Sequence, residues 1–280
     1  EAVGFYSENG FTVLKGSKIS KNSTPSFSSK EYRDEKISSC ATLINENLVE
    51  LNQDLTFKSP SAASSFCLGN SSNGWICWVN EKGQSLDEVY RNKEAQALDD
   101  LYVSHRDDGS HQGWASLCLH GLGAFHTDAA SVYPEFKGID DDKLPYKWTE
   151  IAERCPIATE YFKTKFPYQS YMRLRFMRLA PGGYIAPHND SQTFRLGAVN
   201  ISLNNPVGCE MILEGVGVVP YQDSGSVMAL NTSYNHIVWN QSDETRYHMI
   251  VHGMWNYKWN NIVVNSYKTV LQTQQDTVSL

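Results

Sequence analysis

Short segments with the pattern of β-strands fill the second half of the chain and restrict the folds that it can adopt. Residues 171–179 alternate like a half-buried strand and end at a turn, Pro181-Gly182-Gly183. Further segments follow, each bounded by Gly, Pro, Asn or Asp: 196–203, 209–213, 216–220, 226–230 and 245–251. A helical pattern at 146–162, divided by Pro156, precedes them. This order predicts a mostly β jelly roll with helices packed outside it.

Two histidines and one aspartate occupy the ends of these segments. His188 and Asp190 flank Asn189 after the first long strand, and His236 precedes the last strand. Two imidazoles and one carboxylate hold iron(II) on one face of an octahedron and leave the other positions open for chemistry. We therefore predict that His188, Asp190 and His236 bind Fe(II) and form the catalytic centre.

A second His-x-Asp triplet, His126-Thr127-Asp128, contains the same residue types. It lies in a Gly- and Ala-rich stretch with no strand series behind it, so we predict that it binds no metal. Another short motif, His105-Arg106-Asp107, is similar to a kinase catalytic loop. Neither a glycine-rich ATP loop nor an Asp-Phe-Gly segment accompanies it, which argues against a kinase.

Arg246 is the candidate anchor for a co-substrate. Iron(II) held on one face has room for a bidentate 2-oxoacid and for O2, and a dicarboxylate such as 2-oxoglutarate needs an anchor for its far end. The planar fork of Arg suits a carboxylate and stays charged when buried. Alternation along 245–252 puts Arg246, His248, Ile250 and His252 on one face, which we expect to line the barrel. The alternatives are a surface salt bridge for Arg246 and hydrogen-bonded interior positions for the two histidines.

Polar side chains on two strands are candidates for binding the substrate. Arg173 and Arg175 share one face of the strand at 171–179, and Asn200 and Ser202 share one face of the strand at 196–203. If the opposite, apolar faces pack on the helices, these four side chains line the cavity. We therefore predict a substrate with a carboxylate or another anionic group. In the alternative, one Arg binds 2-oxoglutarate and the other forms a structural ion pair.

Composition and charge exclude several other classes. The net charge of −7 argues against broad nucleic-acid binding. Six scattered cysteines without a C-x-x-C pair indicate reduced thiols rather than a disulfide framework or a zinc site. No apolar run is long enough to span a bilayer, and no secretory signal opens the sequence. We expect a cytoplasmic protein without a membrane partner.

Residues 1–90 are predicted to form a small α+β domain ahead of a larger domain at 91–280. We expect a hairpin within 3–14, helices at 29–43, from Pro60 and at 85–97, and strands at 55–57 and 75–79. The pieces 11–18, 59–63 and 73–75 resemble an uncharacterised domain that is appended to GIY-YIG-type nucleases and restriction-associated proteins. The resemblance implies an accessory or targeting module with a nucleic-acid or protein partner.

Residues 100–256 resemble the aspartyl/asparaginyl β-hydroxylase family and its proline-hydroxylase-like branch, which are Fe(II)- and 2-oxoglutarate-dependent dioxygenases. The resemblance is carried by residues 111–114, 173–177, 181–190, 208–209 and 235–246. It implies a double-stranded β-helix, iron ligands at His188, Asp190 and His236, and Arg246 on the distal carboxylate of 2-oxoglutarate. Animal aspartyl hydroxylases of this family lack the acidic ligand, so Asp190 indicates the bacterial branch, which acts on free amino acids or small substrates.

The resulting functional prediction is a dioxygenase that uses Fe(II), 2-oxoglutarate and O2 to hydroxylate an amino acid or amino-acyl residue of the Asp, Asn or Pro type. Succinate and CO2 are the expected co-products. The alternative is a non-catalytic, cupin-like module that binds a ligand without turnover and is joined to a targeting domain. Consumption of 2-oxoglutarate distinguishes the two.

Overall fold

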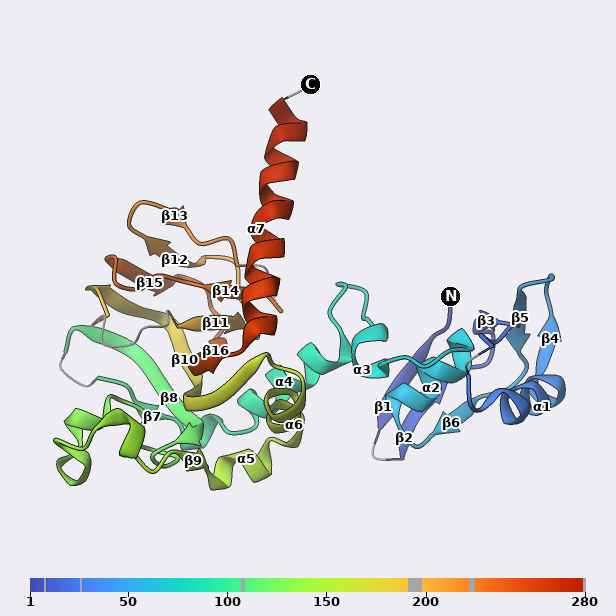
Figure 1. Ribbon diagram of the computed structural model, residues 1–280, viewed down its shortest axis with the longest axis horizontal. Helices are drawn as coiled ribbons and strands as arrows, with labels where there is room; N and C mark the ends of the chain where they lie inside the picture. The colour runs from blue at the N-terminus through green and yellow to red at the C-terminus, as the bar shows by residue number, and fades with distance from the viewer. Residues whose placement is uncertain (8, 26, 107–108, 191–197, 222–224, 279–280) are drawn as a thin grey trace. The chain divides into compact units, whose positions relative to one another are not determined.

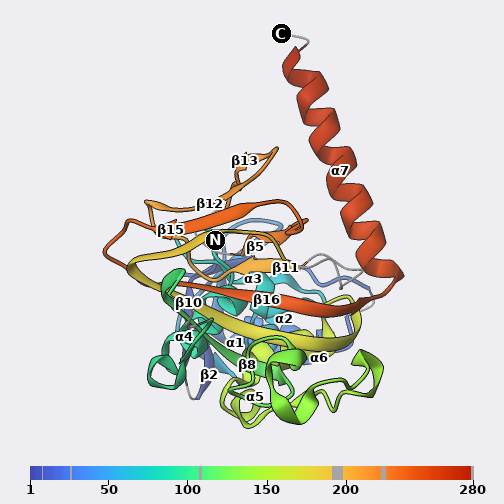
Figure 2. The same cartoon turned by 90° about the vertical axis from the view of Figure 1, so that its left-hand side faces the viewer.

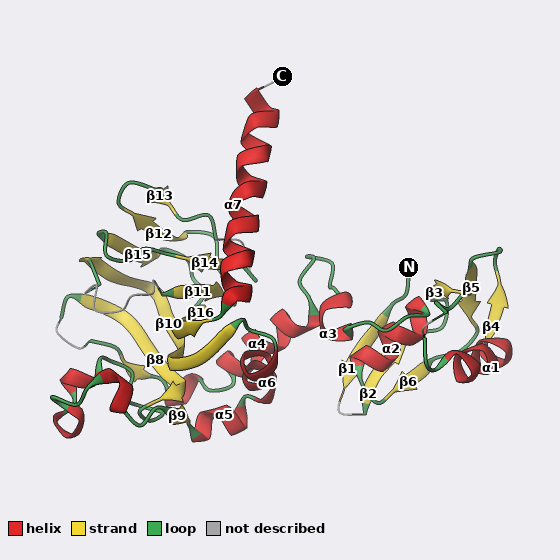
Figure 3. Cartoon of the chain, in the orientation of Figure 1, coloured by secondary structure: helices red, strands yellow, loops and turns green. Residues whose placement is uncertain are grey.

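The computed structural model describes residues 1–7, 9–25, 27–106, 109–190, 198–221 and 225–278 (Figure 1). The chain divides into two compact units, Glu1–Val89 and Tyr90–Leu280. Strands dominate the second unit, and helices and strands mix in the first (Figure 3). No described helix combines the length and the apolar character that crossing a membrane requires.

The described residues of the first unit form two small antiparallel sheets and three helices that lie wholly within it. One sheet has the order β1 (Gly4–Ser7), β2 (Gly10–Val13) and β6 (Leu55–Phe57), and the other has β3 (Lys18–Ser20), β5 (Leu48–Leu51) and β4 (Ala41–Leu43). The helices are α1 (Lys30–Cys40), α2 (Pro60–Leu68) and α3 (Gly74–Cys77). Their shared core includes Phe11, Val49 and Phe66. This unit therefore has α+β character.

Local signals explain where the helices of this unit begin. Helix α2 starts at Pro60 because the Ser59 hydroxyl accepts a hydrogen bond from the Ala62 N–H, and it ends at Gly69, whose φ is +70°. The strand predicted at 75–79 is wrong, because that segment contains α3. The Asn73 side chain accepts from the Trp75 N–H and starts a helical turn, and a short apolar run does not reveal this by its periodicity.

Helix α1 is shorter than predicted, since β4 begins directly after it at Ala41. The fully buried Arg33 of α1 joins three segments of the unit. Its Nε donates to the Phe66 carbonyl at 2.7 Å, its Nη1 donates to the Lys21 carbonyl at 3.0 Å, and its Nη2 donates to the Ser20 carbonyl. Arg33 is therefore a structural residue of the first unit.

The second unit is a curled antiparallel sheet with helices against one face. Its strands follow the order β13 (Gly217–Val218), β12 (Cys209–Leu213), β15 (His236–Asn240), β10 (Tyr168–His188), β16 (Arg246–Trp255), β11 (Val199–Ser202) and β14 (Val227–Ala229). Strand β8 (His111–Gly121) pairs with β10, and β7 (Val103–Ser104) and β9 (Lys147–Trp148) pair with β8. This is the predicted double-stranded β-helix.

Strand β10 produces the curl, because it changes partner along its length. It pairs with β16 up to Leu179, and with β15 from Tyr184 to His188. Between these two stretches Gly182 has φ +69°, and the register against β8 shifts. The residues predicted as a turn after Leu179 are therefore a bulge within a continuous strand. The bulge redirects the end of β10 toward β15.

The two faces of the sheet have different environments. Leu174, Phe176, Met249 and Val251 pack with the helices in the largest core cluster, as the alternation predicts. On the other face, a second cluster fills part of the barrel interior with Trp114, Met177, Leu179, Ile185, Met211, Leu213, Val219 and Val238. Period-2 alternation therefore separates the outer core from the interior.

The helices of this unit follow local start signals. Helix α4 (Leu86–Gln96) begins after Ser85, whose N–H and hydroxyl both donate to the Glu88 carboxylate. Pro156 separates α5 (Glu150–Arg154) from α6 (Pro156–Thr164), as predicted. Short 3-10 turns occur at η1 (Asp99–Leu101), η2 (Ala130–Val132), η3 (Pro134–Phe136) and η4 (Asp141–Lys143). Helix α7 (Tyr257–Val278), which the sequence pattern did not predict, continues from β16 and extends away from the sheet (Figure 2).

Residues 83–280 are expected to fold without the first unit, provided that α4 stays intact. Glu94 of α4 accepts hydrogen bonds from the Ile157 and Ala158 N–H groups, and Arg91 lies 4.3 Å from the ring centre of Tyr161. A cut at Gly83 preserves these contacts. Circular dichroism should show one cooperative melting transition for the fragment. An insoluble or unfolded fragment contradicts this expectation and means that the first unit completes the core.

Candidate metal centre

Three side chains meet at the end of β10, where this strand is paired with β15. His188 is the last residue of β10, and its register partner is His236, the first residue of β15, with ring centres 4.2 Å apart. Asp190 follows β10, and its N–H donates to the Thr232 carbonyl at 2.8 Å. The potential ligand atoms of these three residues all lie within 4.8 Å of one another. No other such group of His, Cys, Asp or Glu occurs in the described part of the chain.

Backbone carbonyls orient both imidazoles. His188 Nδ1 lies 2.8 Å from the Ala186 carbonyl, and His236 Nδ1 lies 3.0 Å from the Tyr234 carbonyl. A carbonyl oxygen only accepts, so each Nδ1 carries the proton and each Nε2 keeps its lone pair for a metal. Burial lowers the pKa of His188, which favours the neutral ring that binds metals.

The spacing of the three donors fits one small divalent ion. Neighbouring ligands of an octahedral ion lie about 3 Å apart when each bond is about 2.1 Å. His188 Nε2 and Asp190 Oδ1 are 3.9 Å apart, so a small rotation of the carboxylate brings them to that spacing. Arg106 Nη2 lies 3.7 Å from the same Asp190 oxygen. The donor set, two neutral imidazoles and a carboxylate, suits iron(II).

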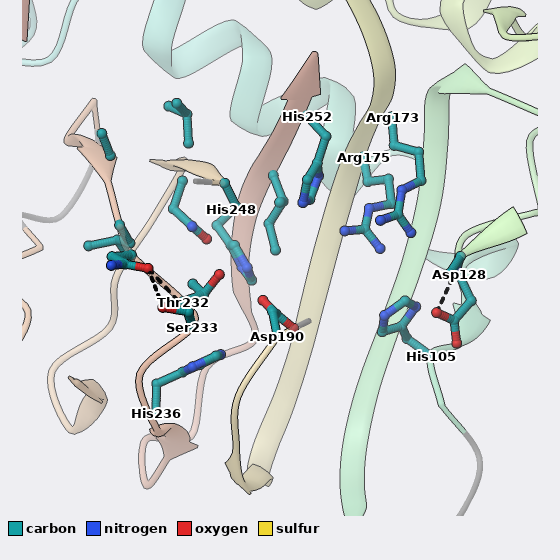
Figure 4. Close-up of a pocket in the computed structure, with 18 of the residues that line it drawn as sticks. His105, Asp128, Arg173, Arg175, Asp190, Thr232, Ser233, His236, His248 and His252 are labelled. Carbon is teal, nitrogen blue, oxygen red and sulfur yellow. Dashed lines mark hydrogen bonds between the residues drawn. The ribbon is translucent and has the colours of Figure 1, made fainter. Parts of the chain in front are cut away.

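The centre opens into a cavity of about 1110 Å³ that also contains most of the predicted binding residues. Figure 4 shows Asp190 and His236 with the strand residues His248, His252, Arg173 and Arg175 around the same space. The polar and charged residues that line it include His105, Arg106, Asp128, Arg173, Arg175, His188, Asp190, Asn200, Thr232, Ser233, His236, Arg246, His248 and His252. Ser202 is buried and is not among the described lining residues, so its predicted contact with substrate has no support.

Arg246 is held rigidly within this cavity. Its side chain is 2% exposed, its Nε donates to Asn205 Oδ1 at 3.1 Å, and its guanidinium carbon lies 5.1 Å from the ring centre of Tyr221. Burial raises the pKa of Tyr221 to about 12, so this phenol stays neutral. No described carboxylate forms an ion pair with Arg246. The predicted alternative of a surface salt bridge does not apply to this buried side chain.

The comparison with known proteins agrees with this architecture. The family model described as Aspartyl/Asparaginyl beta-hydroxylase matches residues 83–255. The chain belongs to this hydroxylase family. Residues 1–90 match a second model, Domain of unknown function (DUF4357). No curated protein sequence is significantly similar to the chain.

Several solved structures are similar to parts of the chain at low identity and low TM-score. A prolyl-4-hydroxylase from Pseudomonas putida has 13% identity and a TM-score of 0.35, over 61% of this chain and 88% of that chain. An oxidoreductase of the 2OG-Fe(II) oxygenase family from Burkholderia pseudomallei has 14% identity and a TM-score of 0.33, over 57% and 76%. A cupin domain from Bordetella pertussis has 17% identity and a TM-score of 0.24, over 30% and 82%.

The hydroxylase unit contains two cavity residues that sequence reasoning missed. His105 and Arg106 were considered only as part of a kinase-like motif, yet both line the cavity. His105 Nδ1 lies 3.1 Å from the Ser116 hydroxyl and 3.3 Å from the Thr127 hydroxyl. The pairing of β7 with β8 brings His105 there, and this pairing leaves no local signal in the sequence.

The second His-x-Asp triplet is divided between two environments in the hydroxylase unit. His126 Nε2 lies 3.1 Å from the Glu135 carboxylate, and His126 is not among the described lining residues, whereas Asp128 lines the cavity. The two side chains do not belong to the group of converging ligands. The structure therefore agrees with the prediction that this triplet is not the metal site.

Three histidines of the hydroxylase unit, the buried His105 and His248 and the half-buried His252, are uncharged at neutral pH. Burial lowers the pKa of His105 to about 2, and burial together with neighbouring arginines holds the pKa of His248 and of His252 well below the ordinary value. His248 Nδ1 has no hydrogen-bond partner among the described residues. These rings therefore add hydrogen-bonding atoms to the cavity without adding charge.

These histidines predict that acid destabilises the hydroxylase unit. Their folded pKa values lie below the unfolded value of about 6.5, so the unfolded chain binds more protons as pH falls below 6.5. Lowering pH from 7 to 5 should cost on the order of 1–2 kcal/mol of unfolding free energy for each of them. Urea denaturation at both pH values measures this loss.

Variants identify the source of the pH effect. His105→Gln should reduce the difference in unfolding free energy between pH 7 and pH 5, because it removes one buried group that titrates only after unfolding. His126→Gln, at a half-exposed position beside Glu135, is the matched control and should leave the difference unchanged. Equal unfolding free energies at pH 7 and pH 5 in the wild type contradict the prediction.

Proposed function

We propose that this chain is an Fe(II)- and 2-oxoglutarate-dependent dioxygenase that hydroxylates an amino acid or amino-acyl residue of the Asp, Asn or Pro type. The observation that carries the proposal is the convergence of His188, Asp190 and His236 at a cavity that also contains the buried Arg246. Membership in the aspartyl/asparaginyl beta-hydroxylase family supports it. Succinate and CO2 are the proposed co-products of 2-oxoglutarate and O2.

His188, Asp190 and His236 would hold the iron ion. When bound, Fe(II) supplies the activation of O2 that hydroxylation of a C–H bond requires. The hydrogen bonds from His188 and His236 to the Ala186 and Tyr234 carbonyls fix the rings before a metal binds. Because the two rings are already oriented, metal binding would lose little of their side-chain conformational entropy.

Arg246 would bind the distal carboxylate of 2-oxoglutarate. Asn205 and Tyr221 hold its guanidinium in place, and burial removes competing water, which strengthens a paired hydrogen bond to a carboxylate. Apolar side chains complete the cavity wall and keep water from the reacting groups; among them are Trp114, Ile185, Met211, Val238 and Ile250. The chain's contribution is therefore to bind, orient and exclude water.

Succinate release is the direct test of this function. The purified chain is incubated with Fe(II), ascorbate, 2-oxoglutarate and O2 together with a panel of free amino acids and short peptides. We expect succinate to form above the level without protein, and one amino acid or peptide to increase its rate and gain one oxygen atom. Binding of 2-oxoglutarate without any consumption of it contradicts the proposal and favours the non-catalytic, cupin-like alternative.

A further inference from the structure

The proposed metal ligand His188 follows a second irregularity in β10. The pairing of β10 with β15 shifts between Ile185 and His188, where three steps along β10 face two steps along β15. Such a bulge takes backbone groups out of the regular ladder and redirects the side chains beside it. The two residues within it are Ala186 and Pro187. Pro187 has no N–H, so of these two only Ala186 brings both a backbone donor and a backbone acceptor.

Histidine side chains bind both backbone groups of Ala186. Its N–H donates to His111 Nδ1 at 3.0 Å, and its carbonyl accepts from His188 Nδ1 at 2.8 Å. His111 is the first residue of β8 and lies 75 positions earlier in the chain than Ala186. We propose that His111 is a positioning residue, which holds the backbone at Ala186 and thereby the imidazole of His188. This inference rests on the function proposed above.

Pro187 makes the connection between the two hydrogen bonds stiff. The residue before a proline is restricted to extended conformations, because the proline ring clashes with it in the helical region. Ala186 therefore has little freedom to turn its carbonyl once its N–H is held by His111. The direction of that carbonyl in turn sets the direction of the His188 ring. A side chain on β8 thus controls a metal ligand on β10.

The hydrogen bonds along this path also fix where the protons lie. The Ala186 N–H only donates, so His111 Nδ1 accepts through a lone pair and carries no proton. The Ala186 carbonyl only accepts, so His188 Nδ1 carries the proton and His188 Nε2 keeps the lone pair that a metal requires. If the carbonyl turns away, the proton of His188 can move to Nε2, and that tautomer cannot bind a metal through Nε2.

Ring contacts place His111 beside His188 rather than among the groups that line the cavity. The ring centres of His111 and His188 are 5.4 Å apart, at an angle of 65°. Trp114 lies edge-on to His111 at 5.1 Å, and its ring centre is 6.3 Å from that of His188. Trp114 and His188 are among the described lining residues of the cavity, and His111 is not. His111 is therefore placed to support the ligand and not to contact a substrate.

The tautomers of the histidines in the metal-free chain test this path directly. Nitrogen-15 NMR of the full chain at about pH 8, above the ordinary histidine pKa of about 6.5, distinguishes protonated from unprotonated ring nitrogens. We expect Nδ1 to carry the proton in His188 and His236 and to lack it in His111. A proton on His111 Nδ1 is incompatible with the hydrogen bond from Ala186 and overturns the proposal.

Two substitutions of His111 separate the hydrogen bond from the bulk of the side chain. His111→Leu removes the acceptor, so we expect His188 to become a mixture of its two tautomers. His111→Asn places a carbonyl oxygen near the position of Nδ1 and should keep the wild-type tautomer of His188. His236 is the internal control in each spectrum, because its Nδ1 is bonded to the Tyr234 carbonyl and should not change.

Binding of Co(II) alone measures the consequence at the metal centre. Calorimetric titration gives the affinity, and visible absorption reports the arrangement of the ligands. His111→Leu should weaken Co(II) binding by about 10–100-fold, as loss of residues that orient metal ligands does, and should change the absorption. His111→Asn should restore most of the affinity. His126→Leu, at a half-exposed position beside Glu135, is the matched control and should bind Co(II) as the wild type does.

Two further results would overturn the proposal. One is a folded His111→Leu variant with the His188 tautomer and the Co(II) affinity of the wild type. The other is an equal loss in His111→Asn, which would assign the effect to the ring contacts. If His111→Leu does not fold, the tautomers of the wild type and of His111→Asn decide: the expected protonation in both supports the path, and a proton on His111 Nδ1 overturns it.

Failure of the dioxygenase proposal is recognised separately. The wild type would then bind no Co(II), or would bind it without consuming 2-oxoglutarate. The NMR measurement needs neither metal nor turnover, so a change of the His188 tautomer in His111→Leu still supports the positioning of His188 by His111 in that case.

Discussion

His188→Ala is expected to remove metal binding almost completely. The variant loses one of three converging donors and cannot replace it, because the described structure places no other His, Cys, Asp or Glu in that group. Changes in residues that merely orient metal ligands already cost about 10–100-fold in affinity, so loss of a ligand should cost at least about 100-fold. Metal content after incubation with Fe(II) and removal of excess ion measures the effect, and succinate formation should disappear with it.

His126→Ala provides the matched control for this experiment. His126 also belongs to a His-x-Asp triplet, but it lies beside Glu135 rather than among the converging ligands. It should retain one iron per chain and its rate of succinate formation. The assignment is reversed if His126→Ala loses the metal while His188→Ala keeps it.

Arg246→Lys should weaken 2-oxoglutarate binding by about 10–100-fold while the metal stays bound. Lysine keeps a positive charge but lacks the planar fork that pairs with both carboxylate oxygens, and it loses the hydrogen bond to Asn205. Titration of 2-oxoglutarate into the Mn(II)-loaded protein measures the change. Arg178→Lys serves as the control on another strand. If Arg246→Lys binds 2-oxoglutarate as the wild type does, the anchor lies elsewhere.

The alternation of side chains made much of the second unit predictable. In the middle of β10 and β16, Leu174, Phe176, Met249 and Val251 alternate with polar residues and pack under the helices. The opposite face therefore contains Arg173, Arg175 and Arg246. The same alternation does not show how far along the barrel axis a residue lies. Ser202 has the parity of Asn200, yet it lies opposite His248 on β16 and is not among the residues that line the cavity.

Features that depend on the pairing of segments far apart in the sequence, or on a single capping residue, were not predictable. Strand β15 was missed because its apolar run has only three residues, 237–239, between His236 and Asn240, which is too short to show a period-2 alternation. His105 reaches the cavity only because β7 pairs with β8. The segment of α3 was misassigned because a few apolar residues fit either a strand or a helix, and the Asn73 cap decided the outcome.

Because β10 continues through the bulge near Gly182, the packing of the first part of the strand and the position of His188 at its end can be altered independently. On one side of the bulge, a shift of register by one residue would move Arg173 and Arg175 into the apolar core and is strongly disfavoured. On the other side, only a short stretch leads to His188. Inserting or deleting a residue at the bulge would therefore move His188, the proposed metal ligand, while leaving the core register intact. The bulge is thus the position at which the proposed metal centre could be moved relative to the rest of the cavity.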